Sequence, residues 1–297
     1  MKYTIKNKYL EIEVDSFGAE LKSLKKLEND TEYLWQGDKK YWNRSSPVLF
    51  PIVGKLLDDE YIYKNKSYKM SQHGFARDKE FVLIAKGENF LMFLQESDSE
   101  TLKVYPFAYK LFISYEIKEY EVKISYEVVN KSKEMMFFSI GAHPAFNWPI
   151  ENINKKIEEK KDDYYFEFYN LDDDKILKAF PLLENGISSK TIDIKLDRKR
   201  LNICEDTFKK DALIFKNENI NSIKLGNYKN NKSIEVCFSD FAYLGLWSKP
   251  NGAPFVCIEP WCGIADFISH NKKIKEKIGI NSLEKDGVFS SSYIIKI

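Results

Sequence analysis

YKLFISYEI (residues 109–117) and YEVKISYEV (residues 120–128) decide the fold class of this 297-residue chain. Apolar and aromatic side chains occupy every second position of both segments, and Glu and Lys side chains alternate with them in the second. A period of two places successive side chains on opposite faces of a β-strand, so each segment is expected to form a strand with one buried face. The polar pair Lys118-Glu119 between them predicts a hairpin.

The same alternation recurs along the chain, whereas helical periodicity is rare. ELKSLKKL at 20–27 and SHNKKIKEK at 269–277 each predict one short amphipathic helical turn. About fifteen strands with few helices predict an all-β fold, a large antiparallel β-sandwich in a single domain spanning 1–297. The further strand-like segments are 3–14, 61–69, 81–85, 90–95, 134–140, 164–169, 212–216, 222–226, 233–238, 243–248, 254–258 and 291–296.

Composition excludes several classes of protein. The 46 Lys and Arg residues balance 45 Asp and Glu residues, so no basic excess indicates nucleic-acid binding. No apolar run of about eighteen residues predicts a membrane span, and the N-terminus lacks the apolar segment of a signal peptide. The four cysteines form no Cys-x-x-Cys pair, which is typical of a reducing compartment. We expect a cytoplasmic protein, a monomer or homodimer, whose partner is a small molecule.

Histidine is scarce, so the setting of each residue is informative. His73 lies in Ser-Gln-His-Gly and His143 in Gly-Ala-His-Pro, in both cases near a glycine and at the end of a predicted strand. Binding residues concentrate on such loops, so both are candidate site residues. His270 lies in a lysine-rich segment and is expected on the surface.

Glu259 is the most informative carboxylate. It follows the apolar run PFVCI (254–258) and precedes Pro260-Trp261-Cys262-Gly263, a stretch that is expected to end the strand. A buried carboxylate is costly unless it is paired or used, and partial desolvation raises its pKa toward the range of a general base. The alternative is a structural ion pair with Arg44 or Arg77.

No short motif indicates a metal or a covalent nucleophile. His-x-His, His-Glu-x-x-His and paired cysteines are absent, as is the Gly-x-Ser-x-Gly elbow of hydrolases. We therefore expect neither a metal nor a cofactor. The cysteines lie mostly in apolar or strand-like sequence, where core packing is their expected role.

Four short motifs, in order, resemble those of the aldose 1-epimerases, or galactose-mutarotase-like proteins. They are Asn43-Arg44, His73-Gly74, His143 with Phe146-Asn147, and Glu259-Pro260, and they span nearly the whole chain. The His-Gly-Phe-Ala-Arg and Glu-Pro-Trp-Cys-Gly versions are more similar to the LacX-like and hexose-phosphate mutarotase branches than to the galactose enzyme itself.

The resemblance implies a β-sandwich of the galactose-mutarotase type with a sugar in an open cleft. It also implies cofactor-independent interconversion of the α and β anomers of a hexose or hexose phosphate. Glu259 would take the proton of the C1 hydroxyl and His143 would give a proton to the ring oxygen. His73 and Arg44 would bind the sugar.

Further candidates come from the same resemblance and from residue chemistry. Asp211 is the candidate for the loop carboxylate with which family members hold sugar hydroxyls. Trp261 and Trp148 are candidates for stacking on a sugar face, with core packing as the alternative. Arg44 and Arg77 stand out in a lysine-rich chain, because forked guanidinium groups suit phosphate; Arg77 is equally suited to ordering the site.

Two other functions fit the sequence. A non-catalytic carbohydrate-binding or sugar-sensing protein of the same fold would bind a sugar without changing the rate of anomer exchange. A glycan lyase or hydrolase would be related by fold alone and would need a second carboxylate about 5–10 Å from Glu259.

Overall fold

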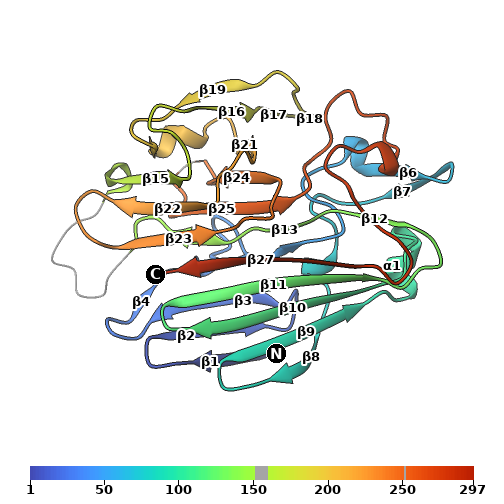
Figure 1. Ribbon diagram of the computed structural model, residues 1–297, viewed down its shortest axis with the longest axis horizontal. Helices are drawn as coiled ribbons and strands as arrows, with labels where there is room; N and C mark the ends of the chain where they lie inside the picture. Colours follow the sequence, from blue (N-terminus) through green and yellow to red (C-terminus); the bar gives the residue numbers. More distant parts are fainter. Residues whose placement is uncertain (151–159, 251) are drawn as a thin grey trace.

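The hairpin that decided the fold class is present in the interior of the nine-stranded sheet. The computed structural model describes residues 1–150, 160–250 and 252–297 (Figure 1). Strands β10 (Tyr109–Lys118) and β11 (Glu121–Asn130) pair antiparallel along their full length. Their alternate apolar side chains are buried, as the period of two predicts.

Two large antiparallel sheets enclose the core. The nine-stranded sheet has the order β20 (Arg200–Asn202), β15 (Tyr164–Tyr169), β22 (Ser222–Asn227), β23 (Ser233–Cys237), β27 (Val288–Lys296), β11, β10, β9 (Phe90–Glu96) and β8 (Val82–Lys86). The eight-stranded sheet has the order β19 (Ile192–Lys195), β16 (Ile176–Phe180), β21 (Leu213–Lys216), β24 (Tyr243–Trp247), β25 (Phe255–Cys262), β13 (Ile140–Ala142) and β5 (Val48–Leu49), with β14 (Ala145–Asn147) also on β25.

Smaller elements complete the structure. The four-stranded sheet has the order β1 (Lys2–Lys6), β2 (Leu10–Asp15), β3 (Glu20–Lys26) and β4 (Thr31–Glu32). The two-stranded sheets are β6 (Glu60–Tyr63) with β7 (Lys66–Lys69), β12 (Met136–Phe138) with β26 (Asn281–Leu283), and β17 (Leu182–Leu183) with β18 (Gly186–Ile187). The helices are α1 (Ser99–Val104) and the 3-10 turns η1 (Leu57–Asp59), η2 (Ala76–Asp78), η3 (Lys161–Asp163), η4 (Glu205–Phe208) and η5 (Ile274–Glu276). Within the described residues, no helix has the length and apolar character needed to cross a membrane.

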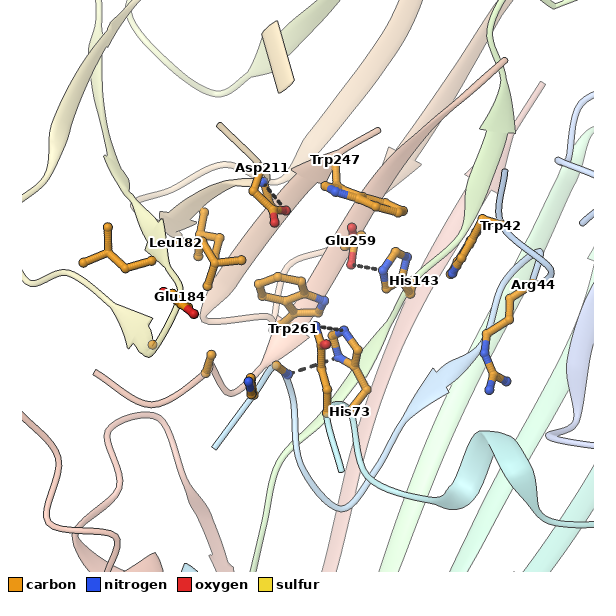
Figure 2. A pocket seen from close by; sticks show the side chains of 18 of the residues that line it. Trp42, Arg44, His73, His143, Leu182, Glu184, Asp211, Trp247, Glu259 and Trp261 are labelled. Atoms are coloured by element: carbon orange, nitrogen blue, oxygen red, sulfur yellow. Dashed lines mark hydrogen bonds and ion pairs between the residues drawn. The ribbon is translucent and has the colours of Figure 1, made fainter. Parts of the chain in front are cut away.

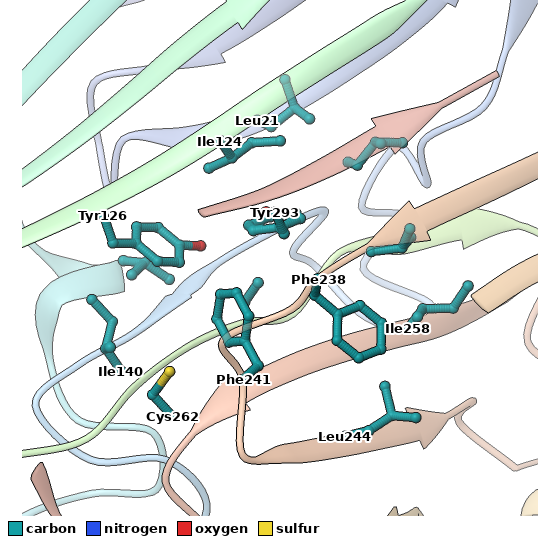
Figure 3. Close-up of a cluster of buried hydrophobic side chains, with 14 of the residues drawn as sticks. Leu21, Ile124, Tyr126, Ile140, Phe238, Phe241, Leu244, Ile258, Cys262 and Tyr293 are labelled. Atoms are coloured by element: carbon teal, nitrogen blue, oxygen red, sulfur yellow. The ribbon is translucent and has the colours of Figure 1, made fainter. Parts of the chain in front are cut away.

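The inner faces of the two large sheets meet in one hydrophobic core. Tyr126 of β11 and Tyr293 of β27 come from the nine-stranded sheet, and Leu244 and Ile258 come from the eight-stranded sheet (Figure 3). Leu21 of the four-stranded sheet belongs to the same cluster. The predicted β-sandwich fold class is therefore confirmed.

Strand β25 is buried along its whole length on both faces. Its even-numbered residues Val256, Ile258 and Cys262 belong to the core between the sheets. Its odd-numbered residues lie on the opposite face, where they meet other aromatic side chains and a cavity. A strand covered on both sides is expected to be apolar throughout, which makes the carboxylate of Glu259 within it exceptional.

The prediction of a helical turn at 20–27 is wrong, because these residues form β3. The three-residue spacing of Leu21 and Leu24 resembles a helix face, yet both leucines are buried on one side of a strand. A register shift against Glu13 and Val14 of β2 explains it: the bulge adds Lys22 as an extra residue between the two leucines.

Near the C-terminus, two expectations hold within narrower bounds and a third is wrong. The helical turn predicted at 269–277 is present as a single 3-10 turn, Ile274–Glu276. Strand β25 stops within the stretch 260–263, but only after Cys262, because Pro260 continues the strand. The side chain of His270 is only 9% exposed and lies 3.9 Å from Asp266, so the expectation of a surface residue is wrong.

Ile113→Ala in β10 is expected to lower the free energy of unfolding by about 2–5 kcal/mol, because it leaves a cavity in the core where Ile113 is 1% exposed. Glu116→Ala, at an exposed position of the same strand, is the matched control and should change stability by about 0.5 kcal/mol or less. Urea denaturation followed by circular dichroism measures both. Equal effects of the two substitutions would contradict the assignment of the buried face.

Candidate active site

Strand β25 supplies the floor of the candidate site. Cys257, Glu259 and Trp261 are two residues apart and therefore project from the same face, away from the sandwich core. Glu259 and Trp261 line a cavity of about 630 Å³ (Figure 2).

His143 reaches Glu259 as its cross-strand neighbour. Gly141 pairs with Trp261, and Ala145 pairs with Cys257, so the common register places His143 opposite Glu259. Side chains at opposite positions of antiparallel strands point to the same face and touch. His143 Nε2 lies 3.2 Å from Glu259 Oε2 (Figure 2).

Two prolines explain why the pairing is interrupted at this point. Pro144 follows His143 and Pro260 follows Glu259, and neither has a backbone N–H for the ladder. The chain opposite β25 is therefore divided into β13 and β14, and His143 lies in the break between them. The same feature accounts for the tolerance of Pro260 inside β25.

Burial sets the protonation of the pair. The side chains of His143 and Glu259 are 9% and 2% exposed. Burial lowers the pKa of His143 to about 3, with the nearby Arg77 acting in the same direction. Burial raises the pKa of Glu259 well above its ordinary value, and the charge of Asp211 adds to the rise. A neutral imidazole beside a neutral carboxylic acid is therefore the favoured form.

His73 lies beside this pair as a neutral hydrogen-bond donor. Its backbone is left-handed, with φ at 67°, and its ring is 5.5 Å from the ring of His143. The backbone N–H of Gly54 donates to His73 Nδ1 over 3.1 Å. Because that nitrogen accepts, the ring proton is on Nε2. Burial lowers the pKa of His73 well below its ordinary value, so the ring stays uncharged.

Aromatic side chains enclose the pair on the other side. The ring of Trp42 lies 4.8 Å from that of His143, and the ring of Trp247 meets it edge-on at 5.7 Å. Both tryptophans line the cavity. They fix the imidazole and exclude water from it, which is the physical origin of its desolvation.

The indole of Trp261 fits only because two neighbouring strands carry glycine. A Cβ added at Gly141 of β13 would lie 2.6 Å from the indole, and one at Gly245 of β24 would lie equally close. The indole nitrogen donates to the carbonyl of Ala142 over 3.2 Å. Trp261 is thus held flat across the sheet, with its ring in the cavity floor (Figure 2).

The structure gathers the residues proposed from the sequence for the site around this cavity, with the exception of Trp148. Arg44, Arg77 and Asp211 also line it. Arg44 lies at its edge and pairs with Asp78 over 2.7 Å (Figure 2). Arg77 donates to the Gln72 carbonyl over 2.6 Å. The alternative for Glu259, an ion pair with Arg44 or Arg77, is therefore wrong within the described residues, where its ionic partner is His143.

The stacking candidate Trp148 lies outside the cavity. It is buried in the core and donates to the Lys161 carbonyl, as the core-packing alternative predicts. Other residues that line the cavity were not predicted. Trp42, Trp247 and Lys55 line the cavity, as does the β17–β18 hairpin with Glu184. None of these residues belongs to a short sequence motif. They come to the site only through the pairing of distant strands in the folded sheet.

Comparison with known proteins identifies the family of this chain. The family model described as aldose 1-epimerase matches residues 1–277. This chain belongs to the aldose 1-epimerase family. LacX of Lactococcus lactis subsp. lactis is 32% identical over 306 aligned residues, which cover 100% of this chain and 99% of LacX.

Solved structures of the family have the same fold. A galactose mutarotase related enzyme from Lactobacillus acidophilus is 34% identical, with a TM-score of 0.92 over 100% of this chain and 97% of that one. A galactose mutarotase-like protein from Lactobacillus casei is 31% identical, with a TM-score of 0.88 over 100% of this chain and 99% of that one.

Gly245→Ala is expected to destabilise the protein by about 1–3 kcal/mol and to displace the indole of Trp261, because the new methyl group overlaps a ring held by both neighbouring strands. Gly87→Ala is the control, since its Cβ would make only an ordinary contact at 3.7 Å. Urea denaturation and near-ultraviolet circular dichroism measure both effects. An unchanged tryptophan signal in Gly245→Ala would contradict the tight fit.

Proposed function

We propose that this protein is an aldose 1-epimerase, an isomerase that interconverts the α and β anomers of a hexose or hexose phosphate. The observation that carries the proposal is the buried His143–Glu259 pair, which faces a cavity together with His73 and Trp261. Anomer exchange needs one group that removes a proton and one that delivers a proton, and no redox cofactor.

The pair has the proton count that this reaction needs. Neutral His143 with protonated Glu259 carries the same two protons as the imidazolium with the carboxylate. Transfer of one proton from Glu259 to His143 interconverts these forms. In the second form, Glu259 takes the proton of the C1 hydroxyl while His143 gives its proton to the ring oxygen, and the bond between C1 and the ring oxygen breaks.

Ring opening leaves the open-chain aldehyde beside neutral His143 and protonated Glu259, the form that burial favours. Rotation about the C1–C2 bond presents the other face of the aldehyde. Reclosure returns the proton of Glu259 to the C1 oxygen, and His143 takes the proton of the attacking hydroxyl. Protons balance over the cycle, and the pair ends as it began.

The surrounding residues are proposed to hold the sugar. The Nε2–H of His73 donates to an oxygen near the ring, and the indole of Trp261 offers an apolar surface for a sugar face. The carboxylate of Asp211, on a residue with φ at 76°, accepts from sugar hydroxyls.

The cationic side chains at the edge of the cavity are proposed to bind the hydroxyl or phosphate substituents of the hexose. Arg44, Arg77 and Lys55 all line it. Asp78 lies within 2.7 Å of Arg44 and within 3.8 Å of Arg77, so the two guanidinium groups share one carboxylate. Guanidinium groups suit a hydroxyl-rich sugar and, more strongly, a phosphate. Both hexoses and hexose 6-phosphates therefore belong in the substrate panel.

Glu259→Gln and His143→Ala are each expected to lower the catalysed rate of anomer exchange by about 10²–10⁴-fold, because each removes one proton-transfer group. His270→Ala, a substitution of the histidine outside the cavity, should retain activity. Polarimetry and anomer-resolved NMR with glucose, galactose and their 6-phosphates measure the rates.

If the folded wild-type protein left all four sugars at their uncatalysed rates, the proposal would fail. Calorimetric binding of a sugar without any rate effect would then support the non-catalytic sugar-binding alternative.

The pH profile of kcat/KM should show neither an inflection at the ordinary pKa of a free carboxyl group nor an acid limb at that of a free histidine, because burial moves both pKa values away from these. The acid limb requires protonation of His143, whose pKa burial lowers to about 3, so it lies far below the ordinary histidine range. The alkaline limb reports loss of the proton of Glu259, whose pKa is raised. The two apparent pKa values are properties of the coupled His143–Glu259 pair and not of either residue alone. An acid limb with its midpoint near 6.5, with circular dichroism showing an intact fold, would contradict the lowered pKa of His143.

A further inference from the structure

We propose that His143, Cys257 and Glu259 together form a binding site for a thiophilic divalent cation such as Zn²⁺. No short sequence motif announces this site, and it goes beyond the proposed epimerase function. The binding itself does not depend on that function, because it requires only the geometry of the three side chains.

The three donors converge because of the strand register. Cys257 and Glu259 project from the same face of β25, two residues apart. His143 is the cross-strand neighbour of Glu259 and the diagonal neighbour of Cys257. One ligand atom from each side chain lies within 4.8 Å of the ligand atoms of the other two, and all three residues are buried.

The donor set suits zinc. Thiolate sulfur, imidazole nitrogen and carboxylate oxygen bind Zn²⁺ at about 2.3, 2.0–2.1 and 2.0–2.2 Å, which in a tetrahedron places the donors about 3.3–3.6 Å apart. The contact between His143 Nε2 and Glu259 Oε2 is already 3.2 Å, so the main adjustment falls on Cys257. Three protein ligands leave a fourth position toward the cavity, open to water.

The ligand atoms have few competing partners. Glu259 Oε2 is buried and makes no hydrogen bond, because its contact with His143 lacks hydrogen-bond geometry. Among the described residues, no hydrogen bond is made by the thiol of Cys257, which is completely buried. Buried polar atoms without partners are costly, and a cation would satisfy them together.

An ion at this position would occupy the two atoms that the proposed reaction uses for proton transfer. His143 could then neither accept nor donate through Nε2, and Glu259 would be held as a bound carboxylate. Zn²⁺ is therefore expected to inhibit anomer exchange reversibly, with chelators restoring activity. Cys257 would be the residue that confers this sensitivity without taking part in the reaction.

Co²⁺ titration of the metal-free full-length protein tests the site directly. Co²⁺ adopts the coordination of Zn²⁺ and reports a bound thiolate by a near-ultraviolet charge-transfer band. We expect one Co²⁺ per chain with this band and with visible bands of tetrahedral intensity, all displaced by Zn²⁺. Cys257→Ser should lose the charge-transfer band and bind Co²⁺ roughly tenfold more weakly or worse, since even supporting residues of metal sites carry effects of this size.

Cys262→Ser is the matched control, because Cys262 is also a buried thiol of β25 but projects into the sandwich core. It should keep the band. Absence of the band in folded wild-type protein, or its persistence in Cys257→Ser, would overturn the site. The band is independent of any sugar, so failure of the metal site and failure of the epimerase proposal are separate results.

Discussion

The site depends on one cross-strand contact, between His143 and Glu259, in a strand that is buried on both faces. The even-numbered residues of β25 anchor it in the core between the sheets, and the odd-numbered residues form the cavity floor. A strand fixed by its core face cannot shift its register by one residue, because every side chain would change sides. Packing of residues such as Ile258 therefore positions the carboxylate on the other face.

The prolines and glycines near this contact make room in the sheet for the side chains of the site. Pro144 and Pro260 remove two ladder donors where the chain must open around His143. Gly141 and Gly245 remove the side chains that would occupy the place of the Trp261 indole. Each of these residues weakens a sheet when considered alone. Together they let the indole of Trp261 and the His143–Glu259 pair lie against the sheet. The cost is a few backbone hydrogen bonds at the break between β13 and β14.

The parts of this arrangement that follow a local pattern could be predicted from the sequence. The alternation at 109–128 gave the hairpin its register, and the apolar run before Glu259 indicated a desolvated carboxylate. The helical turn predicted at 20–27 was wrong because a β-bulge separates Leu21 and Leu24 by three residues, which is the spacing of a helix face. Trp42, Trp247 and the meeting of Cys257 with His143 had no local signal at all, since they are produced by strand pairing between distant segments. The motif order indicated His143 and Glu259 as candidate acid–base residues, whereas their shared burial emerged only in the folded sheet.

Burial makes the pair useful and also makes it a thermodynamic cost. The folded state binds the proton of Glu259 more tightly than the unfolded chain does, so this residue's contribution to stability falls as pH rises above the ordinary carboxyl pKa. The folded state binds a proton on His143 less tightly, with a pKa of about 3, so stability falls as pH drops below the ordinary histidine value. The two costs oppose each other in pH. The sandwich core on the other face of β25 must therefore supply the free energy that keeps both groups desolvated, which is why the strand that carries the chemistry is also among the most deeply buried in the chain.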